Sequence, residues 1–478
     1  MKICLTTEKA IQGNEIYLIS SINVLPENVL SQQEVDYLAN KLTSKINIVS
    51  FNRYSYQVVI ILISKENDFA VNLELCRKAG DDVWQLLKKE KENNVSVYDF
   101  SKGNEEVMAF VEGLMLSSYC FNKYKVRDKA AAIILDNIEL ISDKIEKNEI
   151  QELEILVKAT FKARDLVNEP VMSLNAEGLA AEFSAMAKEA GIEVAIFDKK
   201  KIESLKMGGL LGVNLGSVDA PTFTILEWKP ANAVNKKPVV LVGKGVVYDT
   251  GGMNIKTGNY MENMKIDMAG AAAVASAIYA AALAKLPVHI ITLVPATDNR
   301  VNGNAYVSGD VLTMHSGDTV EVINTDAEGR LILADALSFA KQYDPMVVID
   351  MATLTGAASR AIGKYAIVGM HSHANNFFTS LTAAGNRMCE RIVEFPLWDD
   401  YCELLKSDIA DIKNISDGTD AGAITAGKFL EFFTNYPYIH LDIAGPAHVT
   451  ARYGYRGIGG TGVGVRLLFG YFKGLLKD

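Results

Sequence analysis

The chain has 478 residues, of which 49% are hydrophobic and 22% charged, a composition typical of a globular protein with a large apolar core. Its 48 basic and 58 acidic residues give a formal charge of −10, which argues against a nucleic acid or an anionic membrane as the main partner. The five cysteines form no CxxC pair, and the first residues lack the apolar core of a signal peptide. We therefore expect free thiols in a soluble cytoplasmic protein.

The first third of the sequence alternates strand-like and helix-like segments. Residues 58–63 form an apolar run typical of a strand, and residues 83–91 have the composition of a helix. A charged stretch at residues 143–149 ends this region. These features predict a smaller N-terminal α/β domain, residues 1–155, followed by a second domain, residues 156–478.

The second domain continues the alternation. A helix is predicted over residues 176–190, because Gly191 follows it as a stop signal. Apolar segments between helix-like stretches then predict strands at residues 192–197, 222–228, 238–243, 289–294 and 346–350. This order is typical of an α/β fold with helices on both faces of a central sheet.

Chemically active side chains first gather in a glycine-rich stretch after the strand at 238–243. They are Lys244, Asp249, Lys256 and Asp267. Open α/β sheets usually bind substrates at the carboxyl ends of their strands, and Gly251 and Gly252, which lack a Cβ, allow backbone to lie close to a ligand. An alanine-rich run follows at residues 269–284, too short to span a bilayer. Asp267 is consistent with a cap in the first turn of that helix or with a metal ligand.

The segment Asn324-Thr325-Asp326-Ala327-Glu328-Gly329-Arg330 is the most informative part of the sequence. Side chains two positions apart in an extended segment point the same way, so we expect Asp326 and Glu328 to converge. Two carboxylates at close range repel each other unless a proton or a multivalent cation lies between them. The segment therefore predicts a metal site, with the Arg330 guanidinium following it.

These two motifs together resemble those of the leucyl aminopeptidases, also called cytosol aminopeptidases, a family of two-metal exopeptidases. Residues 324–330 match the signature of that family, and residues 244–268 match its other motif in order. Further blocks agree at residues 331–337, 352–356, 422–426, 440–445 and 461–466. The resemblance covers roughly residues 156–478 and implies that this part is the catalytic domain, with a mixed central sheet flanked by helices.

The resemblance implies two divalent ions per subunit, Zn²⁺, Mn²⁺ or Mg²⁺, since oxygen ligands dominate the set. The implied ligands are Lys244, Asp249, Asp267, Asp326 and Glu328. By similarity, Asp249 and Glu328 bridge both ions. A metal-bridging water would attack the N-terminal peptide bond of a peptide substrate.

Two cationic side chains complete the implied machinery. Lys256 would stabilise the negative charge that develops on the carbonyl oxygen. Arg330 would hold a bicarbonate that takes the proton from the water, because a guanidinium presents a planar fork to such an anion.

The resemblance also implies how the first residue of a substrate is recognised. The segments that would shape its pocket contribute Met264, Thr353, Leu354, Gly356 and Ala444. An apolar lining would favour leucine, methionine or other apolar first residues, by about 0.8 kcal/mol per buried methylene. Family members assemble as hexamers, so the resemblance implies a homohexamer.

Two alternatives remain open at this point. Lys244 has an ordinary pKa of about 10.4, so it could simply neutralise the carboxylates as an ion-pair partner instead of binding a metal. The whole chain could also be a noncatalytic scaffold or binding protein that keeps the fold. Six charged side chains together are costly to maintain without a function, which favours the enzyme.

Overall fold

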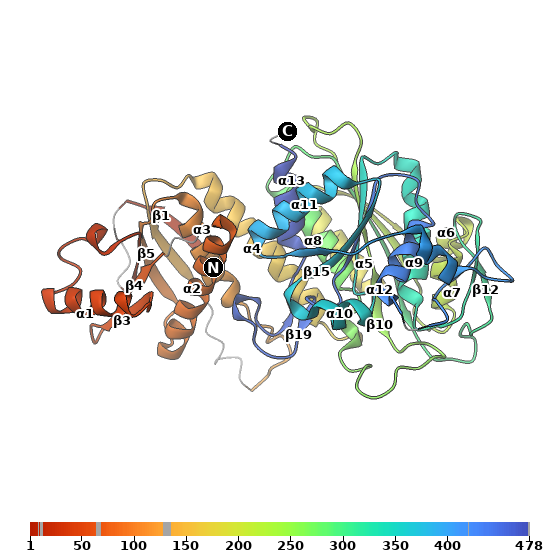
Figure 1. Ribbon diagram of the computed structural model, residues 1–478, viewed down its shortest axis with the longest axis horizontal. Helices are drawn as coiled ribbons and strands as arrows, with labels where there is room; N and C mark the ends of the chain where they lie inside the picture. Colours follow the sequence, from red (N-terminus) through yellow and green to blue (C-terminus); the bar gives the residue numbers. More distant parts are fainter. Residues whose placement is uncertain (8, 10–12, 64–67, 128–134, 419, 477–478) are drawn as a thin grey trace. The chain divides into compact units, whose positions relative to one another are not determined.

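The computed structural model describes residues 1–7, 9, 13–63, 68–127, 135–418 and 420–476. They form two compact units (Figure 1). The first contains the described residues of Met1–Lys158 and the segment Ala451–Gly457, and the second contains the rest. No sequence feature indicated that Ala451–Gly457 returns to the first unit.

The first unit is built on a six-stranded sheet in the order β1-β6-β5-β2-β4-β3. Neighbouring strands are parallel except β3 and β4, so the sheet is mixed. The strands are β1 (Lys2–Thr6), β2 (Asn14–Ile19), β3 (Ile48–Asn52), β4 (Gln57–Leu62), β5 (Asn94–Phe100) and β6 (Asn137–Ile141). The helices are α1 (Gln32–Thr43), α2 (Phe69–Glu90), α3 (Asn104–Ser117) and α4 (Lys147–Asn168), the last of which ends in the second unit.

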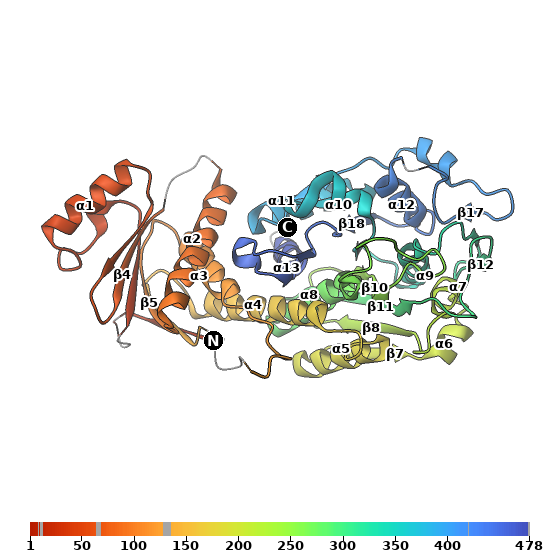
Figure 2. The same cartoon turned by 90° about the horizontal axis from the view of Figure 1, so that it is seen from below.

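The second unit contains a nine-stranded sheet in the order β16-β15-β18-β14-β9-β11-β8-β7, with β10 paired to β11 (Figure 2). Its strands are β7 (Glu193–Phe197), β8 (Thr222–Trp228), β9 (Val239–Gly243), β10 (Gly245–Asp249), β11 (Ile290–Asn299), β14 (Val347–Ala352), β15 (Ile367–Ser372), β16 (Ile392–Glu394) and β18 (Tyr438–Asp442). Strands β9, β10, β11, β14 and β18 run parallel, whereas β7, β8 and β15 pair antiparallel to a neighbour. The predicted α/β fold with a mixed central sheet is confirmed.

The remaining elements of the second unit are helices and short strands. The helices are α5 (Ala176–Ala190), α6 (Lys199–Ser204), α7 (Gly208–Asn214), α8 (Ala269–Leu283), α9 (Glu328–Ala340), α10 (Gly356–Ile362), α11 (Asn375–Met388), α12 (Gly422–Glu431) and α13 (Val465–Gly474). The short strands are β12 (Val311–Thr313), β13 (Thr319–Glu321), β17 (Ile412–Lys413), β19 (His448–Val449) and β20 (Gly459–Gly460).

Helices α8 and α9 cover opposite faces of the central strand β9. Val240 and Val242 belong to the core cluster that contains the apolar residues of α9. The next position after Val242, Gly243, faces α8, because a Cβ there would lie 2.7 Å from the Ala271 Cα. Side chains that alternate along a strand thus reach both layers.

Helix α8 lies close to the sheet because its side chains are small. Every residue from Ala269 to Ala282 is buried. Residues 264–283 form the one described helical stretch long and apolar enough to cross a membrane, and 89% of its apolar window is buried inside the protein. This helix therefore belongs to the protein core.

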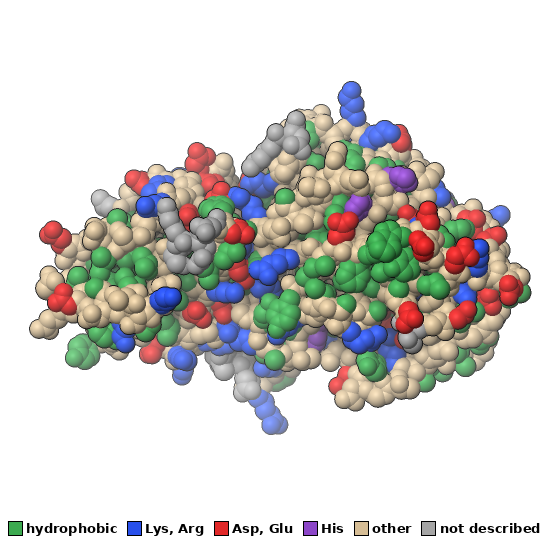
Figure 3. Space-filling view, in the orientation of Figure 1, with side chains coloured by type: hydrophobic (Ala, Val, Ile, Leu, Met, Phe, Trp, Pro, Cys, Tyr) green, Lys and Arg blue, Asp and Glu red, His purple; other side chains and the backbone are tan. Residues whose placement is uncertain are grey.

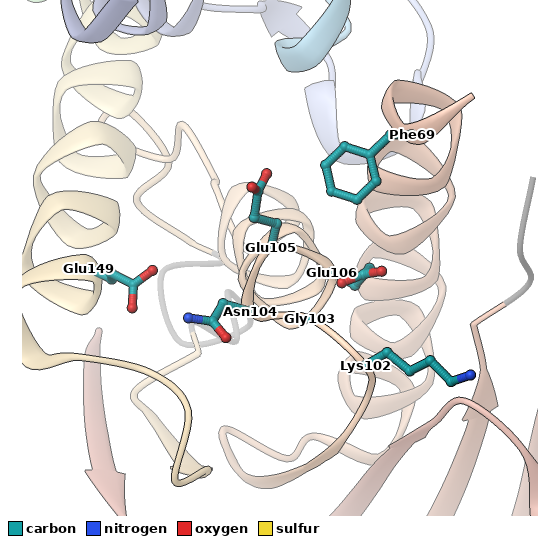
Figure 4. Close-up of a pocket in the computed structure, with 7 residues that line it drawn as sticks. All are labelled: Phe69, Lys102, Gly103, Asn104, Glu105, Glu106 and Glu149. Carbon is teal, nitrogen blue, oxygen red and sulfur yellow. The ribbon is translucent and has the colours of Figure 1, made fainter. Parts of the chain in front are cut away.

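Acidic and basic side chains are interspersed over the face shown in Figure 3. A hollow of about 480 Å³ in the first unit is lined by Phe69, Lys102, Gly103, Asn104, Glu105, Glu106 and Glu149 (Figure 4). Every site residue predicted from the sequence belongs instead to the second unit.

Candidate active site

The candidate site lies at the carboxyl edge of the parallel strands. Lys244 follows β9, Asp249 ends β10, Asn299 ends β11, Thr353 follows β14 and Asp442 ends β18. Because these five strands run in the same direction, their carboxyl ends meet at one edge. This is the edge at which open α/β sheets bind ligands, as the sequence predicted.

The start of α9 adds two carboxylates to this edge. Carboxylate oxygens of Asp249, Asp326 and Glu328 all lie within 4.8 Å of one another. Convergence of Asp326 and Glu328 was predicted from an extended segment, and that geometry is wrong. Ala327 has φ −111° and ψ 39°, and Glu328 is the first helical residue, so the turn into α9 brings the two side chains together.

Each of two lysines lies between two of the carboxylates. The Lys244 ammonium is 2.8 Å from Asp267 Oδ2 and 3.0 Å from Glu328 Oε1. The Lys256 ammonium is 2.7 Å from Asp249 and 2.6 Å from Asp326. The Lys244 contacts are therefore those of an ion-pair partner of Asp267 and Glu328.

Asp267 does not cap the helix that follows it. Its Oδ1 accepts hydrogen bonds from the Lys244 ammonium at 2.9 Å and from the Thr353 hydroxyl at 2.8 Å. The N-cap residue of α8 is Met268, which makes no side-chain cap bond. The side chain thus points into the cluster, and the cap interpretation is wrong.

The cluster is suited to divalent cations. Its four carboxylates face two ammonium groups, which leaves two formal negative charges uncompensated. Asp267 Oδ2 and Glu328 Oε1 are buried and accept no hydrogen bond from the described residues, although the Lys244 ammonium lies beside both. Hard cations take carboxylate oxygens with free lone pairs, so these residues fit a metal pair.

The pKa shifts in the cluster also reflect its excess of negative charge. Burial, followed by repulsion from Asp249 and Glu328, raises the pKa of Asp326 to about 7. Burial lowers the pKa of Lys244, but attraction by Asp267 and the other carboxylates outweighs it and leaves that pKa raised. A nearby dication would have to reverse this direction before Lys244 could act as a ligand.

Uncharged side chains hold the two motifs together. The Thr325 backbone N–H donates to Asn254 Oδ1 at 2.9 Å, and the Asn254 N–H donates to Thr325 Oγ1 at 2.8 Å. Asn299 donates to Asp249 at 2.9 Å and to the Thr325 carbonyl at 3.0 Å. These roles were not predicted from the sequence. Thr325 and Asn254 lie inside the motifs, whereas Asn299 carries no sequence signal.

Arg330 is buried in the first turn of α9. Its Nη1 donates to the Asn414 carbonyl at 2.8 Å. Its Nε is buried and, in the part of the chain that the structure describes, has no acceptor. Burial lowers the pKa of Arg330 to about 10, which leaves the guanidinium charged at neutral pH. A charged donor without an acceptor fits a small anion.

The five predicted pocket residues come from three segments. Thr353 joins the carboxylate cluster through Lys244 and Asp267. Leu354 and Ala444 share a hydrogen-bond acceptor, because both N–H groups donate to Asp442. Gly356 begins α10. Met264 lies in a 3₁₀ turn just before Asp267, and none of its described hydrogen bonds joins it to the other four.

Residues 161–469 match the profile of the cytosol aminopeptidase family, catalytic domain. The chain belongs to this family. It is 46% identical to a probable cytosol aminopeptidase of Chlorobaculum tepidum over 78% of this chain and 76% of that one. A probable cytosol aminopeptidase of Chlorobaculum parvum is 53% identical over 64% of this chain, an alignment that spans 61% of the relative.

Two solved structures share the fold over almost the whole chain. A mutant of tomato leucine aminopeptidase superposes with a TM-score of 0.85 and 26% identity, over 100% of this chain and 97% of that one. The bottromycin maturation enzyme BotP in complex with Mn gives 0.84 and 27%, over 96% and 99%. The family assignment places the chain among the metallo-exopeptidases and confirms the resemblance seen in the sequence.

Proposed function

We propose that this protein is a cytoplasmic aminopeptidase that removes apolar N-terminal residues, leucine foremost, from peptides. The observation that carries the proposal is the convergence of Asp249, Asp326 and Glu328 beside Lys244 and Asp267 in a member of the cytosol aminopeptidase family. These five side chains would hold two divalent ions. When bound, such a pair supplies a nucleophilic water and polarises the scissile carbonyl.

The protein's own cations have separate tasks. Lys256 stays protonated, because its pKa is raised by Asp249, Glu328 and Asp326, an attraction that outweighs the effect of burial. Its ammonium is thus placed to stabilise negative charge on the carbonyl oxygen. Arg330, whose Nε has no acceptor among the described residues, would hold a bicarbonate, and that anion would supply a general base for the water.

Recognition of the substrate follows from the same layout. A free α-amine enters beside Asp267, so peptides with a blocked N terminus fail. Met264, Thr353, Leu354, Gly356 and Ala444 form the first-residue pocket. We also propose that the chain assembles as a homohexamer, as members of the family do.

Replacement of Glu328 by alanine tests the function. This change removes the carboxylate that lies both in the acidic cluster and against Lys244. We expect the variant to bind less Mn²⁺ and to release leucine from Leu-Gly at less than about a hundredth of the wild-type rate. The matched control, Glu403→Ala, removes an exposed glutamate and should behave as wild type.

The assay also separates the enzyme from a noncatalytic scaffold. The wild type should cleave Leu-Gly but leave acetyl-Leu-Gly intact, and EDTA should abolish the cleavage. A metal-loaded wild type that cleaves neither peptide would favour the scaffold. Full turnover by Glu328→Ala at equal metal content would refute the proposed site.

A further inference from the structure

Asp442 lies at the carboxyl end of β18 and is only 1% exposed. Its Oδ1 accepts from the Leu354 N–H at 3.2 Å and from the Ala444 N–H at 3.1 Å. Its Oδ2 accepts from the Thr355 hydroxyl at 2.7 Å. One buried carboxylate therefore joins the loop after β14 to the loop after β18.

The loop after β14 is held on its other side by the carboxylate cluster. The Thr353 carbonyl accepts from the Lys244 ammonium at 3.0 Å, and the Thr353 hydroxyl donates to Asp267 at 2.8 Å. Residues 353–355 thus run between Asp442 and two proposed metal ligands. A displacement of this loop would move the pocket wall relative to the reacting centre.

We propose that Asp442 is a positioning residue that fixes the walls of the first-residue pocket and thereby sets the preference for leucine. This inference rests on the proposed function, which assigns Leu354 and Ala444 to that pocket. Asp442 does not coordinate metal in this scheme, and its hydrogen bonds go to pocket residues and to Thr355.

The chemistry of this position requires a carboxylate. Thr355 Oγ1 already accepts from the Ala358 N–H at 3.0 Å, so its proton is available for Asp442. An asparagine would place its NH₂ group either toward Thr355 or toward the two backbone N–H groups. With the NH₂ group toward the backbone, donors would face donors. With the NH₂ group toward Thr355, the amide would donate to the hydroxyl oxygen and the Thr355 proton would lose its acceptor, so in each orientation at least one of the three bonds to the carboxylate would be lost.

Asp350 provides a matched control. It is a buried aspartate on the neighbouring strand β14, paired in register with His440. It accepts from the Tyr438 hydroxyl at 2.6 Å and contacts His440 Nδ1 at 2.8 Å. These partners lie on β18, outside the pocket loops, so Asp350→Asn disturbs a buried carboxylate of the same sheet without releasing the pocket wall.

The experiment compares kcat and KM of the Mn²⁺-loaded wild type, Asp442→Asn and Asp350→Asn on leucine and alanine p-nitroanilides. We expect Asp442→Asn to retain both metal ions and to lose about 10- to 100-fold in kcat/KM on the leucine substrate. The ratio of leucine to alanine kcat/KM should fall at least about threefold, because a displaced wall contacts the longer side chain less well. Asp350→Asn should keep the wild-type ratio.

An unchanged ratio in a folded, metal-loaded Asp442→Asn would overturn the inference, as would an equal fall of the ratio in Asp350→Asn. If Asp442→Asn does not fold, Thr355→Val removes the hydroxyl bond to Asp442, together with the cap on the Ala358 N–H, and the same ratio decides. A wild type that cleaves neither substrate would instead refute the proposed function. The two failures are therefore distinguishable.

Discussion

A single methyl group at Gly329 should disable the site while leaving the fold intact. Gly329 is the second residue of α9, and a Cβ there would lie 2.6 Å from Lys244 Nζ. Ordinary contacts of a Cβ begin at 3.4 Å, so the methyl group of Gly329→Ala would be about 1 Å too close. Lys244 has little room to retreat, because its side chain is 3% exposed.

The two consequences have different sizes. Overpacking costs about 1–3 kcal/mol of folding free energy, and the better helix propensity of alanine offsets about 1 kcal/mol of it. The net change in the free energy of unfolding is therefore small. Displacement of the Lys244 nitrogen removes one proposed ligand, and even indirect disturbance of ligands lowers metal affinity about 10- to 100-fold.

Calorimetric titration with Mn²⁺, together with Leu-Gly turnover, measures the effect. Gly470→Ala is the control, since Gly470 lies in the helix α13 and the tightest contact of its new Cβ would be with the flexible end of Met388, at 3.2 Å. Gly329→Ala should lose metal affinity and turnover together, whereas Gly470→Ala keeps both. The reasoning is refuted if Gly329→Ala binds Mn²⁺ within twofold of wild type.

Lys256→Met should lower kcat about 10²- to 10³-fold at unchanged metal content, measured by steady-state kinetics; a kcat near wild type would exclude its proposed role. The Asn414 side chain accepts from the Ile323 N–H at 2.8 Å, directly before the motif at residues 324–330. Asn414→Ala removes this bond, so kcat should fall while the melting temperature drops only a few degrees. Burial raises the pKa of Asp335 to about 7. Its protonation therefore contributes to the free energy of unfolding fully below about pH 4, and this contribution is lost as the pH rises to about 7. Urea unfolding in EDTA should show this loss in wild type and not in Asp335→Asn.

The sequence predicted the elements whose pattern is local. The alanine-rich run became the buried helix α8, and the apolar runs became β7, β8, β9, β11 and β14. Strands β15 and β18 were not predicted, because they carry polar residues such as His371 and Asp442 that interrupt an apolar run. Their place in the sheet depends on pairing with each other and with β14, which is tertiary information.

Some residues of the candidate site were likewise predicted from the sequence and others were not. Two compact motifs contain the charged residues of the cluster, so their types and spacing were visible in the sequence. Asn299 and Asn414 were not, because each is a single polar residue whose partners lie 26 to 91 positions away. Asp442 lies in the matching block 440–445, but its bond to Leu354 spans 88 positions, so its role was not visible. The turn that joins Asp326 to Glu328 was also not predicted. An extended segment would include Glu328, whereas helix α9 already begins at that residue.

The central claim is that Lys244, Asp249, Asp267, Asp326 and Glu328 hold two divalent ions at one edge of the sheet. Anomalous diffraction from crystals soaked in Mn²⁺ tests it most directly. The account predicts two manganese peaks about 3.5–4 Å apart, each within coordinating distance of these side chains. A single peak, or peaks bound by other residues while these five stay ion-paired, would contradict it.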